Sequence, residues 1–137
     1  MSPMSAMELD STNFVSTVSR KGIVLVECRA PWCGACKAFT PVFEQVAAKH
    51  PEHMFAMLDT EKSADIAAKL GLQHVPALLL YRDGILLFMQ AGSFAENRLE
   101  DILSQAEGLD MDAVRAEIEA DRQAGQAGDV TAGSDAP

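Results

Sequence analysis

The chain carries two closely spaced cysteines in the stretch Ala30-Pro31-Trp32-Cys33-Gly34-Ala35-Cys36-Lys37. Two cysteines separated by two residues can form a disulfide only if the backbone turns sharply between them. A helix that begins at Cys33 provides this turn, and its free N–H groups would stabilise a thiolate on that cysteine. Because the thiolate is the attacking species in thiol–disulfide exchange, this arrangement favours redox chemistry.

Apolar patterns around the cysteines predict alternating strands and helices. Residues 23–26 form a run rich in β-branched side chains, which is typical of a strand buried on both faces. Apolar residues at spacings of three and four between 39 and 47 predict a helix after Cys33. Later segments predict a strand at 54–59, a helix at 63–70, strands at 76–81 and 85–89, and a helix at 94–106. We therefore expect an α/β fold with a central mixed sheet of four to five strands and helices on both faces.

The two ends of the chain differ from this pattern. Residues 1–8 are expected to form a flexible N-terminus or a short edge strand, before a domain that spans residues 9–107. Asp110 can cap an additional C-terminal helix with one narrow apolar stripe, which we place at residues 108–123. The composition of residues 124–137 predicts a disordered acidic tail.

The formal net charge of −9 is concentrated near the C-terminus. Residues 1–95 carry nine acidic and eight basic side chains, whereas residues 96–137 carry eleven acidic and three basic ones. This balance argues against nucleic acid or an anionic membrane as a partner. The sequence also contains no apolar run of the roughly 18 residues that a membrane-spanning helix needs.

The cysteine content indicates a reducing environment. Three cysteines, two of them in one motif, do not form a structural disulfide framework. The first ten residues lack a basic segment followed by an apolar stretch, so we expect no secretory signal. A cytoplasmic location is therefore predicted.

Residues 9–107 resemble the thioredoxin family. The resemblance rests on the motif of residues 32–37 after a buried strand, together with Pro41 in the following helix, Val75-Pro76 before a strand, the Asp83-Gly84 hairpin and Gly92. It implies the thioredoxin fold and a thiol–disulfide oxidoreductase that reduces protein disulfides. In such a cycle Cys33 attacks the substrate to form a mixed disulfide, and Cys36 resolves it.

Glu27 is a candidate proton acceptor because it lies in an otherwise apolar strand, six residues before Cys33. Burial would raise its pKa towards neutrality. Thioredoxins carry an aspartate at this position, which is thought to help deprotonate the resolving cysteine. Glutamate is longer, and the family's usual lysine partner is replaced here by Met57. The alternative is a carboxylate at the strand's edge, paired with a surface base.

The resemblance also implies a substrate-binding surface. Pro76 matches a cis-proline that faces the disulfide, and the backbone of Val75 would pair with an extended substrate segment. An ordinary trans-proline is the alternative. The flat apolar rim on which substrates rest would comprise Trp32, Gly34, Ala35, Ala91 and Gly92. Ala35 replaces the proline usual between thioredoxin cysteines, which is expected to make the redox potential somewhat more oxidising.

The implied partners are disulfide-containing proteins and a thioredoxin reductase that supplies electrons, ultimately from NADPH. We expect a monomer with no bound cofactor. We also expect no metal. A zinc site at Cys33 and Cys36 needs two more ligands, usually a second closely spaced pair. Cys28, which is expected in the core, and the three scattered histidines do not form such a pair. Two alternatives are a disulfide oxidase or isomerase, and an interaction or chaperone module that uses the acidic C-terminal extension.

Overall fold

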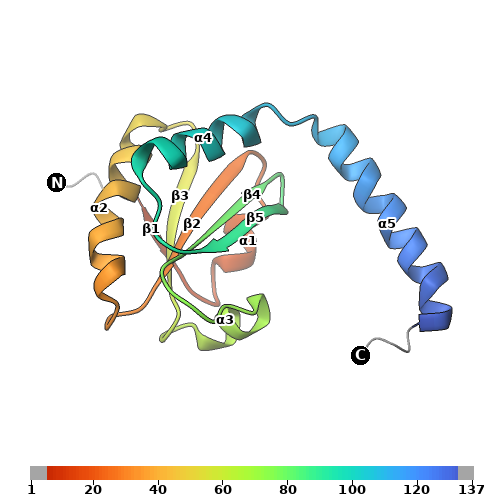
Figure 1. The fold of residues 1–137 in the computed structure, drawn as a ribbon, viewed down its shortest axis with the longest axis horizontal. Helices are drawn as coiled ribbons and strands as arrows, with labels where there is room; N and C mark the ends of the chain where they lie inside the picture. Colours follow the sequence, from red (N-terminus) through yellow and green to blue (C-terminus); the bar gives the residue numbers. More distant parts are fainter. Residues whose placement is uncertain (1–5, 133–137) are drawn as a thin grey trace. The chain divides into compact units, whose positions relative to one another are not determined.

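A computed structural model of the chain describes residues 6–132, with side chains for residues 6–124. Five strands form one sheet in the order β1-β3-β2-β4-β5 (Figure 1). This sheet and the helices around it confirm the α/β class predicted from the sequence. The strands are β1 (Met7–Leu9), β2 (Ile23–Arg29), β3 (Met54–Asp59), β4 (Ala77–Arg82) and β5 (Ile85–Ala91), and the helices are α1 (Phe14–Val18), α2 (Gly34–Lys49), α3 (Ala64–Leu70), α4 (Glu96–Glu107) and α5 (Met111–Ala132).

The sheet is mixed. β2 and β1 each pair with β3 in parallel, whereas β4 pairs antiparallel with both β2 and β5. A two-residue turn joins β4 to β5, and both of its residues have positive φ, 54° at Asp83 and 82° at Gly84. This is the backbone that matches the twist of paired strands, which explains the strong hairpin signal of Asp-Gly.

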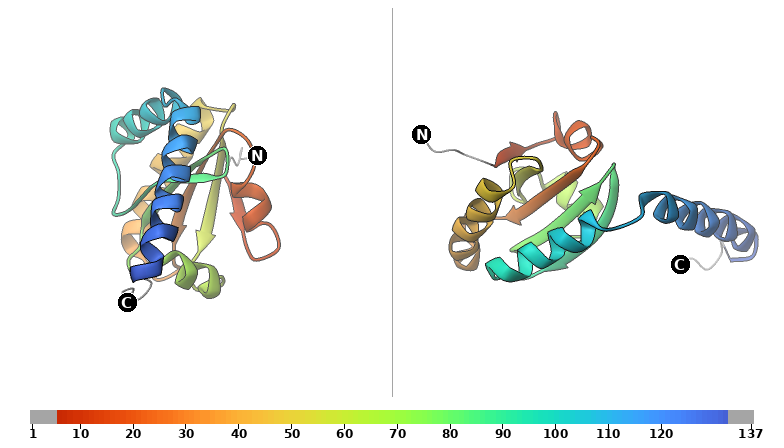
Figure 2. Two further views of the ribbon diagram at one scale, coloured as in Figure 1. Left: turned by 90° about the vertical axis from the view of Figure 1, so that its right-hand side faces the viewer. Right: turned by 90° about the horizontal axis from the view of Figure 1, so that it is seen from above.

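Helices cover both faces of the sheet (Figures 1 and 2). One apolar cluster joins α2 and α4 to the face of the sheet that carries Leu25 and Leu78. A second cluster joins α1 and α3 to the opposite face, which carries Val26 and Leu79. Successive strand residues point to opposite faces, so both sides of β2 are packed. Burial on both sides explains why its sequence is a continuous apolar run.

Glu27 is the exception within this buried strand. It lies on the face covered by α2 and is completely buried, as are its neighbours Val26 and Cys28. Cys28 lies on the other face, in the cluster with α1 and α3. The sheet therefore separates the third cysteine from the layer that holds Glu27 and α2.

The chain divides into two compact units, with the boundary between Glu107 and Gly108. β1 forms a short edge strand that includes residues 7 and 8. In the second unit, α5 continues to Ala132, past residue 123, where the sequence predicted its end and the start of a disordered tail. Alanine and glutamine favour the helix there, although two glycines weaken it. Residues 1–5 and 133–137, which include parts of the predicted flexible ends, lie outside the described residues.

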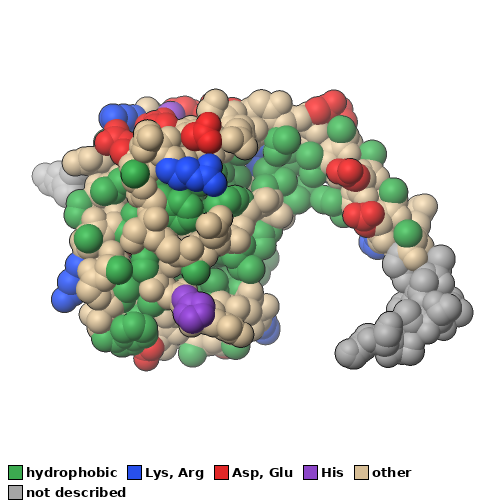
Figure 3. Space-filling view, viewed as in Figure 1, with side chains coloured by type: hydrophobic (Ala, Val, Ile, Leu, Met, Phe, Trp, Pro, Cys, Tyr) green, Lys and Arg blue, Asp and Glu red, His purple; other side chains and the backbone are tan. Residues whose placement is uncertain are grey.

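Acidic side chains are distributed along the described part of α5 (Figure 3). Arg115 and Arg122 each pair with a carboxylate three residues earlier, which stabilises the exposed helix surface. Among the described residues, no helix combines the length and apolar character that crossing a membrane requires.

Candidate active site

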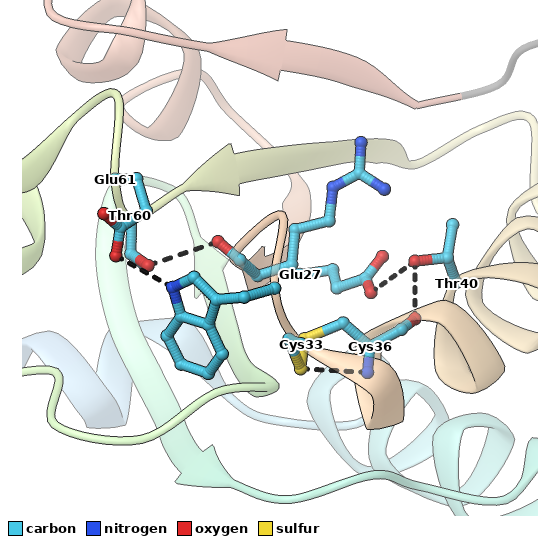
Figure 4. Close-up of a disulfide and its surroundings, with 8 residues drawn as sticks. Glu27, Cys33, Cys36, Thr40, Thr60 and Glu61 are labelled. Atoms are coloured by element: carbon cyan, nitrogen blue, oxygen red, sulfur yellow. Dashed lines mark hydrogen bonds between the residues drawn. A yellow bond between two sulfur atoms is a disulfide. The ribbon is translucent and has the colours of Figure 1, made fainter.

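Cys33 and Cys36 form a disulfide at the start of α2, with their Cα atoms 5.3 Å apart. Cys33 is the N-cap residue of this helix, and its sulfur accepts a hydrogen bond from the backbone N–H of Cys36 at 3.0 Å (Figure 4). After reduction, the same N–H and the positive end of the helix would stabilise a thiolate on Cys33. The local structure therefore supplies the attacking species that thiol–disulfide exchange requires.

Both sulfur-bearing residues lie just beneath the surface. The solvent-exposed fraction is 4% for Cys33 and 2% for Cys36. They pack with Ala30 and the half-buried Val75 in a small apolar cluster of their own. The residues on either side of Cys33, Trp32 and Gly34, are exposed, as is Ala35. The disulfide thus lies at the base of a surface formed by small or flat side chains.

The segment that carries Val75 and Pro76 borders the disulfide. The peptide bond between these residues is cis, the geometry expected for Pro76. The Pro76 carbonyl accepts a hydrogen bond from the Gly92 N–H at 2.7 Å, and Ala91 pairs in register with Ala77. The structure therefore brings together the cysteines, the proline segment and the end of β5, which are far apart in sequence.

Trp32 is 69% exposed, and its indole N–H donates to Glu61 Oε2 at 3.1 Å. Trp32 and Val75 line the same pocket of about 300 Å³, together with Glu61 and His74. Glu61 was not identified from the sequence. Its position follows from topology, since β2 and β3 are parallel and the loops after both strands meet at one edge of the sheet.

Glu27 is buried beneath α2 near Cys36. Its Oε2 accepts a hydrogen bond from the Thr40 hydroxyl at 2.7 Å, and its Oε1 has no hydrogen-bond partner among the described residues. Burial raises the pKa of Glu27 to about 6, although the Thr40 hydrogen bond and the nearby Arg29 oppose this rise. A carboxyl group with this pKa can exchange a proton near neutral pH.

Thr40 connects Glu27 to the active-site helix. Its hydroxyl lies 2.7 Å from Glu27 Oε2 and 2.9 Å from the Cys36 carbonyl oxygen (Figure 4). Met57 pairs in register with Glu27 on β3, at the position where the resemblance placed a lysine. Thr40 was not identified from the sequence, but its spacing of four residues from Cys36 is the signal that places both on one side of a helix.

A second pocket, of about 250 Å³, lies beside Cys36 and is lined by Arg29, Lys37 and Asp59, among others. Cys28, in contrast, is a core residue, as the sequence predicted. Burial raises the pKa of its thiol to about 12, and the neighbouring charge of Glu27 adds to this rise.

The family model for thioredoxin matches residues 5–105. The chain belongs to the thioredoxin family. A Streptomyces coelicolor protein named "Putative thioredoxin 2" is 40% identical over 124 residues, which cover 90% of this chain and 91% of that protein. "Thioredoxin C-3" of Corynebacterium nephridii is 32% identical over 104 residues, with 75% of this chain and 72% of that protein covered.

The structural comparison agrees with this assignment. A mutant thioredoxin from Halobacterium salinarum matches 80% of this chain and 97% of its own, with a TM-score of 0.72 and 27% identity. Family, fold and the helix-capping cysteine pair together identify a thiol–disulfide oxidoreductase with protein-disulfide reductase activity. Disulfide-containing substrates and a reductase partner follow from the family as a whole.

Proposed function

We propose that Cys33 is the nucleophile, Cys36 the resolving cysteine and Glu27 the base of a cycle that reduces protein disulfides. The Cys36 N–H that points at the Cys33 sulfur, at 3.0 Å, is the observation that carries this proposal. It favours the thiolate on Cys33 rather than on Cys36, so the two sulfurs have different roles.

The cycle consists of two exchange steps. The Cys33 thiolate attacks one sulfur of a substrate disulfide, a Cys33–substrate bond forms, and the other substrate sulfur leaves as a thiolate. Cys36, deprotonated with Glu27 as the acceptor, then attacks the Cys33 sulfur and releases the second substrate sulfur. Two electrons pass to the substrate, and the protein is left with the Cys33–Cys36 disulfide.

The substrate surface in this proposal is formed by exposed and half-buried residues around the disulfide. Val75 would present its backbone to an extended substrate chain beside Pro76, as an added strand does. Flat apolar contact would come from Trp32, Gly34, Ala35, Ala91 and Gly92. The proximity of Val75 to both cysteines and to the Trp32 pocket supports this arrangement.

The electrons for each cycle would come from a thioredoxin reductase and ultimately from NADPH, with no cofactor bound to this chain. The protein would act as a cytoplasmic monomer in electron transport to disulfide substrates. A reducing compartment suits a chain whose third cysteine is a buried thiol rather than part of a structural disulfide.

A redox titration of the Cys33–Cys36 pair tests the direction of this electron flow. We expect an equilibrium potential more negative than about −200 mV, because a disulfide reductase must be more reducing than oxidases and isomerases, at about −120 to −180 mV. The measurement is the fraction of thiol in glutathione or dithiothreitol buffers of known potential. Ala35→Pro, which the first turn of a helix tolerates, should make the potential more negative. A potential in the oxidase range would contradict the proposal.

Substitution of Thr40 tests the assignment of Glu27 as the base. Thr40→Val removes a hydrogen bond that stabilises the Glu27 carboxylate, so the pKa of Glu27 should rise above about 6. We expect the midpoint of the pH–rate profile for mixed-disulfide resolution to move upward by about one pH unit, given the usual strength of hydrogen bonds to charged groups. Stopped-flow measurement of single turnovers gives this profile.

Thr40→Ser is the matched control for this experiment, because it keeps the hydroxyl and removes only a methyl group. Its pH midpoint should stay at the wild-type value. If Thr40→Val slows resolution equally at every pH, then Thr40 acts only on the structure of α2 and the proton route through Glu27 is wrong.

A further inference from the structure

Two histidines and three glutamates converge where α2 ends, at the opposite end of the helix from the disulfide. His50 is the C-cap residue of α2 and begins a tight turn, His50-Pro51-Glu52-His53, in which the His53 N–H donates to the His50 carbonyl at 3.0 Å. The turn stacks the two imidazole rings, with centroids 5.8 Å apart and planes 15° from parallel. Both rings are largely covered, with 19% and 12% of the side-chain area exposed.

His50 lies between two carboxylates. Its Nε2 is 2.7 Å from Glu100 Oε1 on α4, and its Nδ1 is 3.3 Å from Glu52 Oε2. A neutral imidazole has only one N–H. If that N–H is donated to Glu100, the Nδ1 lone pair faces the lone pairs of Glu52. This contact becomes favourable only when a cation lies between them, either a proton on Nδ1 or a metal ion.

His53 completes the group from the other side. Its Nε2 lies 2.7 Å from Glu107 Oε2 and 3.6 Å from Glu52 Oε2. Glu107 is the last residue of α4, where the Arg82 guanidinium holds the backbone by donating to the carbonyls of Ala106, at 2.6 Å, and Glu107, at 3.3 Å. The ligand atoms therefore come from two segments that are each fixed by backbone hydrogen bonds.

We propose that His50, Glu52, His53 and Glu107 form a binding site for a divalent transition-metal ion of the zinc class. One ligand atom from each of these side chains lies within 4.8 Å of all the others. Tetrahedral zinc with bonds of 2.0–2.2 Å places its ligands about 3.3–3.6 Å apart. Three of the separations between candidate ligand atoms are 2.7, 3.3 and 3.6 Å and the others do not exceed 4.8 Å, so side-chain rotations would bring the four atoms to this spacing.

The donor set and its surroundings fit this class of metal. Imidazole nitrogen suits zinc, copper and nickel, whereas magnesium and calcium require oxygen ligands alone. Glu100 already accepts from the far nitrogen of His50, which is the carboxylate–histidine–metal arrangement that orients a ligating ring. Acidic and basic side chains both lie over this end of the molecule (Figure 3), and a pocket of about 260 Å³ opens beside Glu52, His53 and Glu107 and is also lined by Arg82.

The site is separate from the redox centre. Cys33 and His50 cap opposite ends of the 16-residue helix α2, which spans about 24 Å. We expected no metal from the sequence, because Glu107 and Glu100 join His50 and His53 only through the packing of α4. Zinc bound at this site is not expected to change the rate at which the Cys33–Cys36 pair reduces protein disulfides.

Isothermal titration of Zn²⁺ into the oxidised protein tests the proposal, since the disulfide prevents Cys33 and Cys36 from binding zinc. We expect one ion per chain and an increase in Tm. His53→Gln and Glu107→Gln should each lower the association constant at least tenfold, and Glu100→Ala, which removes the acceptor that orients the His50 ring, about tenfold. In the wild-type protein, nitrogen NMR should show metal-induced shifts of the His50 and His53 rings, which removes any dependence on variant folding.

His74→Gln is the matched control, because His74 is an exposed histidine outside this cluster, and its zinc affinity should equal that of the wild type. Zinc binding that persists in the His50→Gln/His53→Gln double variant would overturn the proposal. So would equal affinity for Mg²⁺ or Ca²⁺, or binding that requires reduced cysteines. Protonation of His50 without any uptake of zinc at neutral pH would show that the cation in this cluster is only a proton.

Discussion

We expect Cys33→Ser to abolish the reduction of insulin by dithiothreitol-driven cycling, leaving only the rate of the reductant itself, and Cys36→Ser to trap its substrate as a mixed disulfide. In the first variant no sulfur occupies the N-cap of α2, so no thiolate forms at the helix end. In the second, the proposed nucleophile Cys33 would still attack, but no second sulfur would release the mixed disulfide. Turbidity of precipitating insulin measures the activity, and non-reducing electrophoresis with mass spectrometry detects the trapped complex.

Cys28→Ala is the matched control for these two variants, because it removes the third sulfur from the opposite face of the sheet. Its activity should remain within about twofold of the wild type, and its cost should be limited to stability, of about 1 kcal/mol for a small buried side chain. Reversal of the two phenotypes, with Cys33→Ser trapping substrate through Cys36, would show that the roles of the sulfurs are exchanged.

Glu27→Gln should remove a pH-dependent loss of stability. Because the pKa of Glu27 is about 6 in the folded protein and 4.5 is its ordinary value, the fold favours the neutral acid. Ionisation of Glu27 therefore lowers the free energy of unfolding. This loss is absent below pH 4.5, grows as the pH rises to 6 and is then constant at about 2 kcal/mol. Between pH 4 and pH 8, the wild type should therefore lose about 2 kcal/mol more unfolding free energy than the variant. Urea unfolding at both pH values measures this difference.

The comparison between pH values cancels any constant cost of placing a buried amide next to Thr40. Glu8→Gln, an exposed carboxylate on β1, is the control and should follow the wild-type pH dependence. Single-turnover resolution at Cys36 should also be slower in Glu27→Gln, with its pH dependence near 6 removed. Identical pH dependence of stability in Glu27→Gln and the wild type would show that the carboxyl group is solvated rather than buried.

Local sequence signals were sufficient for most of the fold. The β-branched run of β2, the apolar spacing along α2 and the Asp83-Gly84 turn each depend on neighbours in sequence, so they could be interpreted without the structure. A charged residue inside an apolar strand likewise identified Glu27 as unusual. The resemblance to the family identified the cysteine pair and Pro76, whose segment lies beside the disulfide.

The remaining features depend on contacts between distant segments. Glu61 reaches Trp32 across the sheet edge, and Glu107 reaches His53 only after α4 has packed on the sheet; neither contact has a local signature. The sequence predicted the end of α5 at residue 123, whereas the helix extends to Ala132, in a segment where alanine favours the helix and each glycine disfavours it by about 1 kcal/mol, so that the sums for helix and coil differ little. Such small differences do not fix a boundary.

The burial of Cys28 determines which disulfide the protein can form when it is oxidised. Burial raises the pKa of Cys28 to about 12, so its thiol stays protonated at neutral pH, and it lies in the apolar cluster on the face of the sheet opposite α2. Each round of oxidation therefore has a single product, without mispaired isomers that would need to be unscrambled. In the reduced protein, air, peroxide or an alkylating label would react with Cys33 and Cys36, whereas Cys28 would react only after the chain unfolds.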